Sequence, residues 1–293
     1  MPTVYPDFYP EFHCLASRCT HSCCKGWQID VDNSSADYYL TLPGTLGDAL
    51  RLNLKKDDEG WHFRLDQEER CPFLQKSGLC RIICELGEES LCDICALHPR
   101  FYGSLGEWEF CGLGLSCEAV VMLLTQSEAT LKYRIENEML DISNLLRRIG
   151  IPLSNDFLHF IPYPDYEHYQ KILNALSLTE PIDNAWTIEV EYLRTNLDTV
   201  VRRLNELPRP HSFPLYDKIF SYILYRQLER LNIYPIDVLQ AFAQSSTEFV
   251  LLQSIMDGDV SEHLRRWSEQ IEYSTENVDR LLTFPEYSSS SIM

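Results

Sequence analysis

From about residue 136 onward, apolar positions recur with the period of an α-helix. The clearest case is the segment 186–207, where apolar residues alternate at spacings of four and three: Trp186, Val190, Leu193, Leu197, Val200, Leu204 and Leu207. Because residues three and four apart share one face of a helix, this pattern predicts one helix with a single apolar stripe. Such a stripe is first of all a packing surface, so we assign it to the core of a helical domain.

The same reasoning predicts further helices in the second half of the chain, separated in several places by Pro or Gly. They cover residues 165–177, 214–231, 236–256, 259–272 and 275–283. We therefore predict a helical bundle over residues 126–287. The last residues, SSSSIM, are polar and small, which predicts a frayed tail over 288–293.

The first part of the chain has a different pattern. Apolar and polar residues alternate around Leu50–Leu54 and again around Trp61–Leu65, on either side of the turn sequence DDEG, which predicts a β-hairpin. A weaker hairpin is predicted over 101–115, and short helices over 34–42 and in the sequence EAVVMLLTQ that follows Cys117. The predicted fold is mainly α with small β-hairpins, in which a cysteine-rich metal-binding module over residues 1–125 precedes the helical bundle.

All eleven cysteines lie between Cys14 and Cys117. Dense cysteines are typical of secreted disulfide-bonded domains, but the N-terminal sequence has neither the basic nor the apolar region of a signal peptide. No run reaches the roughly 18 apolar residues that a membrane span needs. We therefore expect a cytoplasmic protein without a membrane association, in which the thiols stay reduced and are used for metal or redox chemistry.

The net charge is −19, from 44 acidic and 25 basic residues. Nucleic-acid binding draws most of its affinity from clustered Lys and Arg, so this composition argues against a nucleic-acid partner. It favours a basic or lysine-bearing protein partner instead.

The spacing of the cysteines predicts metal ligation, because thiolates select zinc, copper(I) or iron–sulfur clusters. A zinc ribbon would have two CxxC knuckles, whereas the chain has one, at Cys92 and Cys95. A CxxxCxxC cluster motif is also absent, since Gly26 stands three positions after Cys23. Spacing alone therefore leaves the metal open. Two cysteines, Cys84 and Cys111, are interpreted as small buried hydrophobic residues.

Three cysteine blocks carry a family resemblance: FHCLASRCTHSCCKGWQIDVD, CPFLQKSGLCRIICELGEESLCDICALHPRF and LGLSCEAVVMLL. In their order and spacing they resemble the flagellin lysine-N-methylase family, which belongs to a broader group of cysteine-rich proteins described as zinc- or iron-chelating. The resemblance covers about residues 8 to 125. The metal ligands that it implies are Cys14, Cys19, Cys23, Cys24, Cys71, Cys80, Cys92, Cys95 and Cys117.

The resemblance implies methyl transfer from S-adenosylmethionine to the ε-amine of lysines on flagellin or a similar protein. It also implies a metal centre, either an iron–sulfur cluster of the 4Fe-4S type or zinc. No Gly-rich nucleotide loop follows a predicted strand, so the residues themselves show no methyltransferase site. Without the resemblance they favour a non-enzymatic zinc- or iron-binding module that responds to redox conditions, because they show metal ligands and a helical bundle but no catalytic constellation. The resemblance favours the methyltransferase.

A lysine must lose its proton before methylation, so a carboxylate or tyrosine close to the metal centre could serve as the base. Asp30, Asp32, Tyr38 and Tyr39 follow the first cysteine block, but a strand end and a helix face explain them equally well, and no catalytic residue is assigned. We interpret His98 as a histidine at a helix end in preference to a metal ligand.

Overall fold

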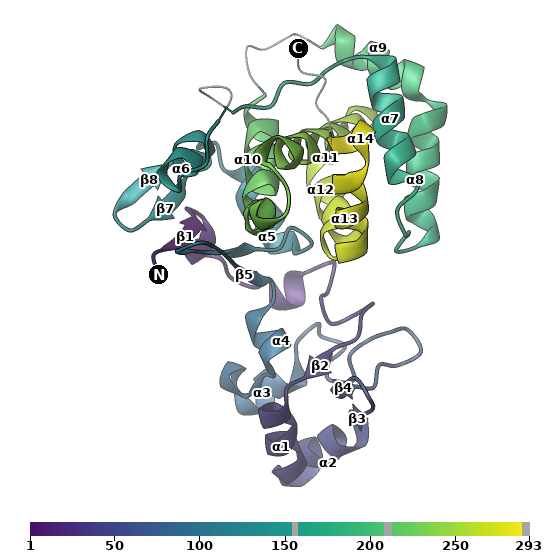
Figure 1. Ribbon diagram of the computed structural model, residues 1–293. Coiled ribbons are helices and arrows are strands. Elements are labelled where there is room, and N and C mark those ends of the chain that lie inside the picture. The colour runs from purple at the N-terminus through teal and green to yellow at the C-terminus, as the bar shows by residue number, and fades with distance from the viewer. Residues whose placement is uncertain (154–157, 208–212, 289–293) are drawn as a thin grey trace. The chain divides into compact units, whose positions relative to one another are not determined.

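The computed structural model describes residues 1–153, 158–207 and 213–288 (Figure 1). Two compact units are present. The cysteine-rich unit consists of residues 13–101 and 117–119, and the helical unit consists of residues 1–12, 102–116 and the chain from Val120 onward. These limits differ from the predicted ranges 1–125 and 126–287. Of the predicted tail, 289–293 lies outside the described residues.

The helical unit contains a five-stranded sheet in the order β5-β6-β1-β7-β8. Its strands are β1 (Thr3–Pro6), β5 (Arg100–Leu105), β6 (Trp108–Leu113), β7 (Tyr133–Ile135) and β8 (Glu138–Leu140). The N-terminal strand β1 is central: Val4 lies opposite Phe110 of β6 in a parallel pair and opposite Ile135 of β7 in an antiparallel pair. This pairing is the reason that the first residues of the chain belong to the helical unit. The hairpin predicted over 101–115 is confirmed as β5 and β6.

Helices form most of the structure, which confirms the mainly α fold. They are α5 (Glu118–Gln126), α6 (Ile142–Arg148), α7 (Tyr166–Leu176), α8 (Asn184–Thr195), α9 (Leu197–Glu206), α10 (Pro214–Arg226), α11 (Ile236–Asp257), α12 (Val260–Trp267), α13 (Thr275–Thr283) and α14 (Pro285–Ser288). The long, largely buried α11 packs against α10, α12 and α14 (Figure 1). No helix in the described part of the chain is both long and apolar enough to cross a membrane.

The single helix predicted over 186–207 is wrong, because the chain forms two helices, α8 and α9, that meet at Asn196. The backbone N–H and the side-chain amide of Asn196 both donate to the carbonyl of Tyr192, at 3.1 and 2.8 Å. The side chain thus competes for the backbone acceptor and α8 ends there. The predicted stripe is buried on both helices as far as Leu204, whereas Leu207 is 40% exposed.

Two other predicted helices change their winding before they end. The segment 214–231 is α10 followed by the 3₁₀ helix η4 (Leu228–Asn232), and 259–272 is α12 followed by the π-helix η5 (Ser268–Glu272). In η5 the hydroxyl of Ser268 donates to the carboxylate of Glu272 at 2.7 Å. The predictions at 165–177, 236–256 and 275–283 are confirmed.

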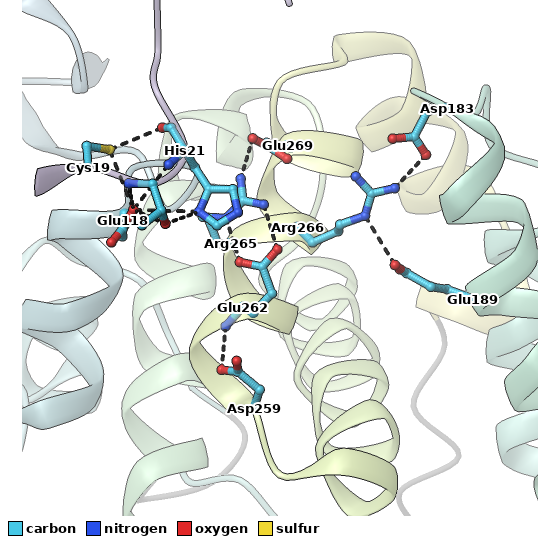
Figure 2. A network of polar contacts seen from close by, with 11 residues as sticks. Cys19, His21, Glu118, Asp183, Glu189, Asp259, Glu262, Arg265, Arg266 and Glu269 are labelled. Atoms are coloured by element: carbon cyan, nitrogen blue, oxygen red, sulfur yellow. Dashed lines mark hydrogen bonds and ion pairs between the residues drawn. The ribbon is translucent and has the colours of Figure 1, made fainter. Parts of the chain in front are cut away.

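Two adjacent arginines fasten α12 within the helical unit (Figure 2). The side chain of Arg265 is only 5% exposed and pairs with Glu262 and Glu269, one turn before and after it. Arg266 pairs with Asp183, the N-cap of α8, and with Glu189 of α8. Because ion pairs with these carboxylates occupy both guanidinium groups, Arg265 and Arg266 have a structural role in the helical unit.

The cysteine-rich unit has a small three-stranded antiparallel sheet in the order β2-β4-β3. Its elements are β2 (Asp30–Val31), α1 (Asn33–Thr41), α2 (Gly44–Asn53), β3 (Leu54–Lys56), β4 (Trp61–Phe63), α3 (Arg81–Leu86) and α4 (Asp93–Leu97). The helix predicted over 34–42 is confirmed as α1. The predicted hairpin is confirmed as β3 and β4, but its first strand begins only at Leu54.

The residues before Leu54 form a helix, and their buried leucine side chains are four residues apart. Leu46 and Leu50, one helical turn apart on α2, are buried, whereas Leu52 is 71% exposed. On a helix, residues two apart point to opposite sides, so Leu50 and Leu52 cannot share the core. The alternation of apolar and polar residues from Leu50 to Leu54 therefore does not mark a β-strand before Leu54.

The core of the cysteine-rich unit is small and aromatic. The ring of Phe63 stacks on that of Tyr39 at 6.0 Å between centroids and meets that of Phe73 edge-on at 5.0 Å. Two cysteines, Cys71 and Cys92, are buried in the same cluster. The thiols thus lie directly against the core that supports them.

Candidate metal centre

The first cysteine loop is fastened by Glu118, the first residue of α5. Its Oε2 accepts hydrogen bonds from the backbone N–H and the hydroxyl of Thr20, at 2.8 and 2.9 Å, and from the backbone N–H of His21 at 3.3 Å (Figure 2). Partial burial acts in the opposite direction, but these hydrogen bonds hold the pKa of Glu118 below its ordinary value. The loop around Cys19 is therefore held next to Cys117.

Mutual electrostatic effects link the nine candidate cysteines into two groups, which meet at the adjacent residues Cys23 and Cys24. The first thiol group consists of Cys14, Cys19, Cys23 and Cys117. Burial raises the pKa of Cys19 to about 11, with a further contribution from the charge of Cys117. A hydrogen bond with Cys24 and the charges of Cys14 and Cys117 raise the pKa of Cys23. These sulfurs are thus close enough to affect one another.

The second thiol group consists of Cys24, Cys71, Cys80, Cys92 and Cys95. Burial and the charges of Cys24 and Cys80 raise the pKa of Cys71 to about 12. A hydrogen bond with Cys92, burial, and the charges of Cys92, Cys24 and Cys71 raise the pKa of Cys95. The hydrogen bond from Cys23 lowers the pKa of Cys24 to about 7. The adjacent residues Cys23 and Cys24 therefore have different sets of neighbours.

Backbone N–H groups lie close to sulfurs of the second thiol group. Hydrogen-bonding contributions from the N–H groups two and three positions further along the chain act to lower the pKa of Cys71 and Cys80, and one from the N–H of Cys95 acts to lower the pKa of Cys92. Such bonds stabilise negative charge on sulfur, and hydrogen bonds of this kind tune thiolate ligands in metal sites. The donor set therefore fits a soft metal or an iron–sulfur cluster.

The sulfurs are nevertheless not gathered to coordination distance. Across the described residues, no three His, Cys, Asp or Glu side chains form a group that could hold a metal ion. Metal ligation by the nine cysteines stays a prediction.

The two cysteines left out of the ligand set differ in their surroundings. Cys111 is buried in β6, where burial raises its pKa and the hydroxyl of Tyr9 lies within hydrogen-bonding distance. Cys84 is exposed on α3, and its charge contributes to raising the pKa of Cys80. The interpretation of Cys111 as a buried small residue is confirmed, whereas for Cys84 it is wrong, because the residue is exposed.

Asp32 and Tyr39, two of the residues weighed as bases, have structural contacts. Tyr39 is fully buried and its hydroxyl donates to the carbonyl of Ser90 at 2.7 Å. Asp32 caps α1 by accepting from the N–H of Ser35 at 2.8 Å, and its other oxygen accepts from the N–H of Asp93, the first residue of α4, at 3.0 Å. One carboxylate thus joins α1 to the helix of the CxxC motif.

Replacing Asp32 by Asn is expected to keep the cap on α1 and to lose the bond to α4, since an amide offers one acceptor oxygen. Asp32→Ala loses both and should cost about 2 kcal/mol of unfolding free energy. Burial tends to raise the pKa of Asp32, but its hydrogen bonds lower it below the ordinary 3.8. The stabilisation of the folded state by the ionised Asp32 carboxylate is therefore fully present above pH 3.8, and it is lost as the pH falls through the folded-state pKa. Urea unfolding at several pH values measures this, and equal losses for both variants at neutral pH would contradict it.

The histidine of the second block lies at a helix end. The backbone N–H of His98 donates to the carbonyl of Ile94 at the end of α4, and burial lowers its pKa. Its ring lies 6.3 Å from that of Trp27, whose indole N–H donates to the carbonyl of Cys23 at 2.7 Å. The predicted position of His98 is confirmed. Sequence reasoning missed the anchoring role of Glu118, for which its place directly after Cys117 was the only signal.

Comparison with known proteins gives three related matches, each 31% identical over 121 residues, or 39% of this chain. One is the flagellar biosynthetic protein FliU of Salmonella muenchen, of which the match covers 72%. The chain belongs to the FliU family. The other two are proteins named lysine-N-methylase from Salmonella typhimurium and Salmonella choleraesuis, and in both the match covers 30% of the relative.

The chain thus spans less than a third of the lysine-N-methylases that it matches, although it spans most of the FliU protein. No family model matches the sequence. No solved structure matches the fold. The family assignment therefore depends on sequence similarity over part of the chain.

Proposed function

We propose that the chain acts in lysine N-methylation of flagellin or a similar protein, and that its cysteine-rich unit carries a metal centre. The observation that carries this proposal is the similarity to proteins named lysine-N-methylase and FliU. The arrangement of nine thiols in two groups, with backbone N–H groups close to several sulfurs, supports the metal centre. An iron–sulfur cluster of the 4Fe-4S type or zinc would suit these ligands.

In the proposed reaction the deprotonated ε-amine of lysine attacks the methyl carbon of S-adenosylmethionine. A C–N bond forms, the C–S bond breaks, S-adenosylhomocysteine leaves, and the lysine proton passes to a base or to water. The metal centre would act as a structural or electrostatic support for the unit that contains it. The net charge of −19 would favour encounter with lysine-rich segments.

A second candidate is a non-enzymatic, redox-responsive metal module. The observation in its favour is that the thiols of two pairs, Cys23 with Cys24 and Cys92 with Cys95, lie close enough to shift each other's pKa. Paired thiols of this kind can lose two electrons and two protons to an oxidant such as a disulfide and form a disulfide themselves. In this case iron or zinc would be released on oxidation and no methyl group would be transferred.

Co-expression with flagellin tests the first function. We expect intact-mass spectrometry of the flagellin to show an increase of one methylene per modified lysine. Replacing both Cys23 and Cys24 by Ser should abolish this, because the change removes one thiol from each group. The matched control is Cys84→Ser, which should methylate as the wild type does. Unmodified flagellin with iron-replete, anaerobically prepared wild-type protein would contradict methylation and favour the redox module.

A further inference from the structure

A cavity of about 290 Å³ lies on one face of the sheet β2-β4-β3. Val31, Leu54 and Phe63 face the core, so His62, which alternates with Phe63 on β4, faces the other side. Lys55 of β3 lies opposite His62 in the register of the sheet. The floor of the cavity is therefore polar, although it stands on the core of the unit.

Two loop segments form the walls, and backbone hydrogen bonds join them. The N–H of Gly26 donates to the carbonyl of Glu69 at 3.0 Å, and the N–H of Cys71 donates to the carbonyl of Cys24 at 2.8 Å. Asp66 closes its own turn by accepting from the N–H of Arg70 at 2.9 Å. Because both walls are fastened to each other, the cavity is a built feature of the fold.

The cavity is lined by the cationic side chains of Lys55 and Arg64, together with His62, Gln28 and the carboxylate of Glu69. His62 is 7% exposed, and its buried Nδ1 has no hydrogen-bond partner. Asp57 Oδ2 lies 3.6 Å from this atom and 3.7 Å from Lys55 Nζ, within ion-pair distance but beyond good hydrogen-bonding distance in both cases. Arg64 also lines the cavity and forms no ion pair among the described residues. The chain has a net charge of −19, so a cavity lined by two cationic side chains differs from the acidic character of the chain as a whole.

We propose that this cavity binds a small oxyanion, the carboxylate or phosphate group of a small molecule. The guanidinium of Arg64 and the ammonium of Lys55 supply charge-assisted hydrogen bonds. Trp27, which also lines the cavity, offers an apolar face for the remainder of the ligand. This inference does not depend on methyl transfer.

Titration of the full-length protein tests this site. The probes are inorganic phosphate and S-adenosylhomocysteine, which carries a carboxylate, at constant ionic strength. Binding is followed by the indole N–H signals in ¹H–¹⁵N spectra. We expect saturable binding of at least one probe, with a shift of the Trp27 signal. Arg64→Gln should raise the dissociation constant about tenfold, as expected for loss of a hydrogen bond to a charged group.

The matched control is Arg51→Gln, which removes an exposed arginine of α2 that pairs with Asp48 outside the cavity. This variant should bind as the wild type does. Lys55→Gln is the second test of the cavity and decides the question if Arg64→Gln does not fold. If only inorganic phosphate shifts the Trp27 signal, the ligand class is a phosphate group. If only S-adenosylhomocysteine shifts it, the ligand class is a carboxylate. No saturable binding of either probe, or equal binding by the cavity variants and Arg51→Gln, would overturn the proposal.

Discussion

If the proposed metal centre is present, its removal is expected to unfold the cysteine-rich unit and to leave the helical unit folded. The thiols lie against a small core that includes Cys71 and Cys92, so the metal would replace the stabilisation that a larger core supplies. Structural zinc contributes about 10 kcal/mol of folding free energy, which is comparable to the total stability of a domain. Limited proteolysis after chelation, read by mass spectrometry, should show cleavage within residues 13–101 and survival of α10–α13.

Two cysteine variants serve as the control for this experiment. Cys24→Ser changes a member of the second thiol group and should make the same region sensitive to protease without any chelator. Cys84→Ser changes an exposed cysteine outside both groups and should leave the digestion pattern unaltered. Resistance of residues 13–101 in the metal-free wild type would show that the core alone holds the unit together.

Glu272→Gln is expected to destabilise the helical unit by about 3 kcal/mol, because it removes the carboxylate that balances the buried charge of Arg226. The carboxylate of Glu272 is 1% exposed and accepts from Arg226 Nε at 2.6 Å, while the side chain of Arg226 is only 11% exposed. Its second oxygen accepts from the hydroxyl of Ser268 at 2.7 Å. The amide of Gln would keep the shape but lose the charge. Urea unfolding followed by circular dichroism measures the change.

The exposed pair formed by Arg194 and Glu191 is the matched control. Their side chains are 41% and 64% exposed, so Glu191→Gln should change stability by less than about 0.5 kcal/mol. A double variant, Arg226→Met with Glu272→Leu, should recover much of the loss, because no charge is then left buried without a partner. Equal effects of Glu272→Gln and Glu191→Gln would refute this role of the buried pair.

The regular helices could be predicted from the sequence because their signals are local. Periodic apolar residues mark α7, α11 and α13, and the structure has these helices within a residue or two of the predicted bounds. The same local patterns predicted the wrong element where a side-chain hydrogen bond or core packing opposed them. The side chain of Asn196 ends α8 within a continuous stripe, and packing of Leu46 and Leu50 makes a helix of a segment that alternates like a strand.

The sequence by itself also predicts the chemistry of the candidate site, since thiolates in three cysteine blocks favour soft metals or redox reactions whatever the fold. Only the tertiary structure decided which groups meet. Glu118 holds a loop that lies almost a hundred residues earlier, Asp32 joins two helices, and β1 enters the centre of a sheet between β6 and β7. The cavity beside His62 likewise exists only because two distant loops are joined by backbone hydrogen bonds. Such contacts form only when the whole unit is packed, so patterns among residues near one another in the sequence do not predict them.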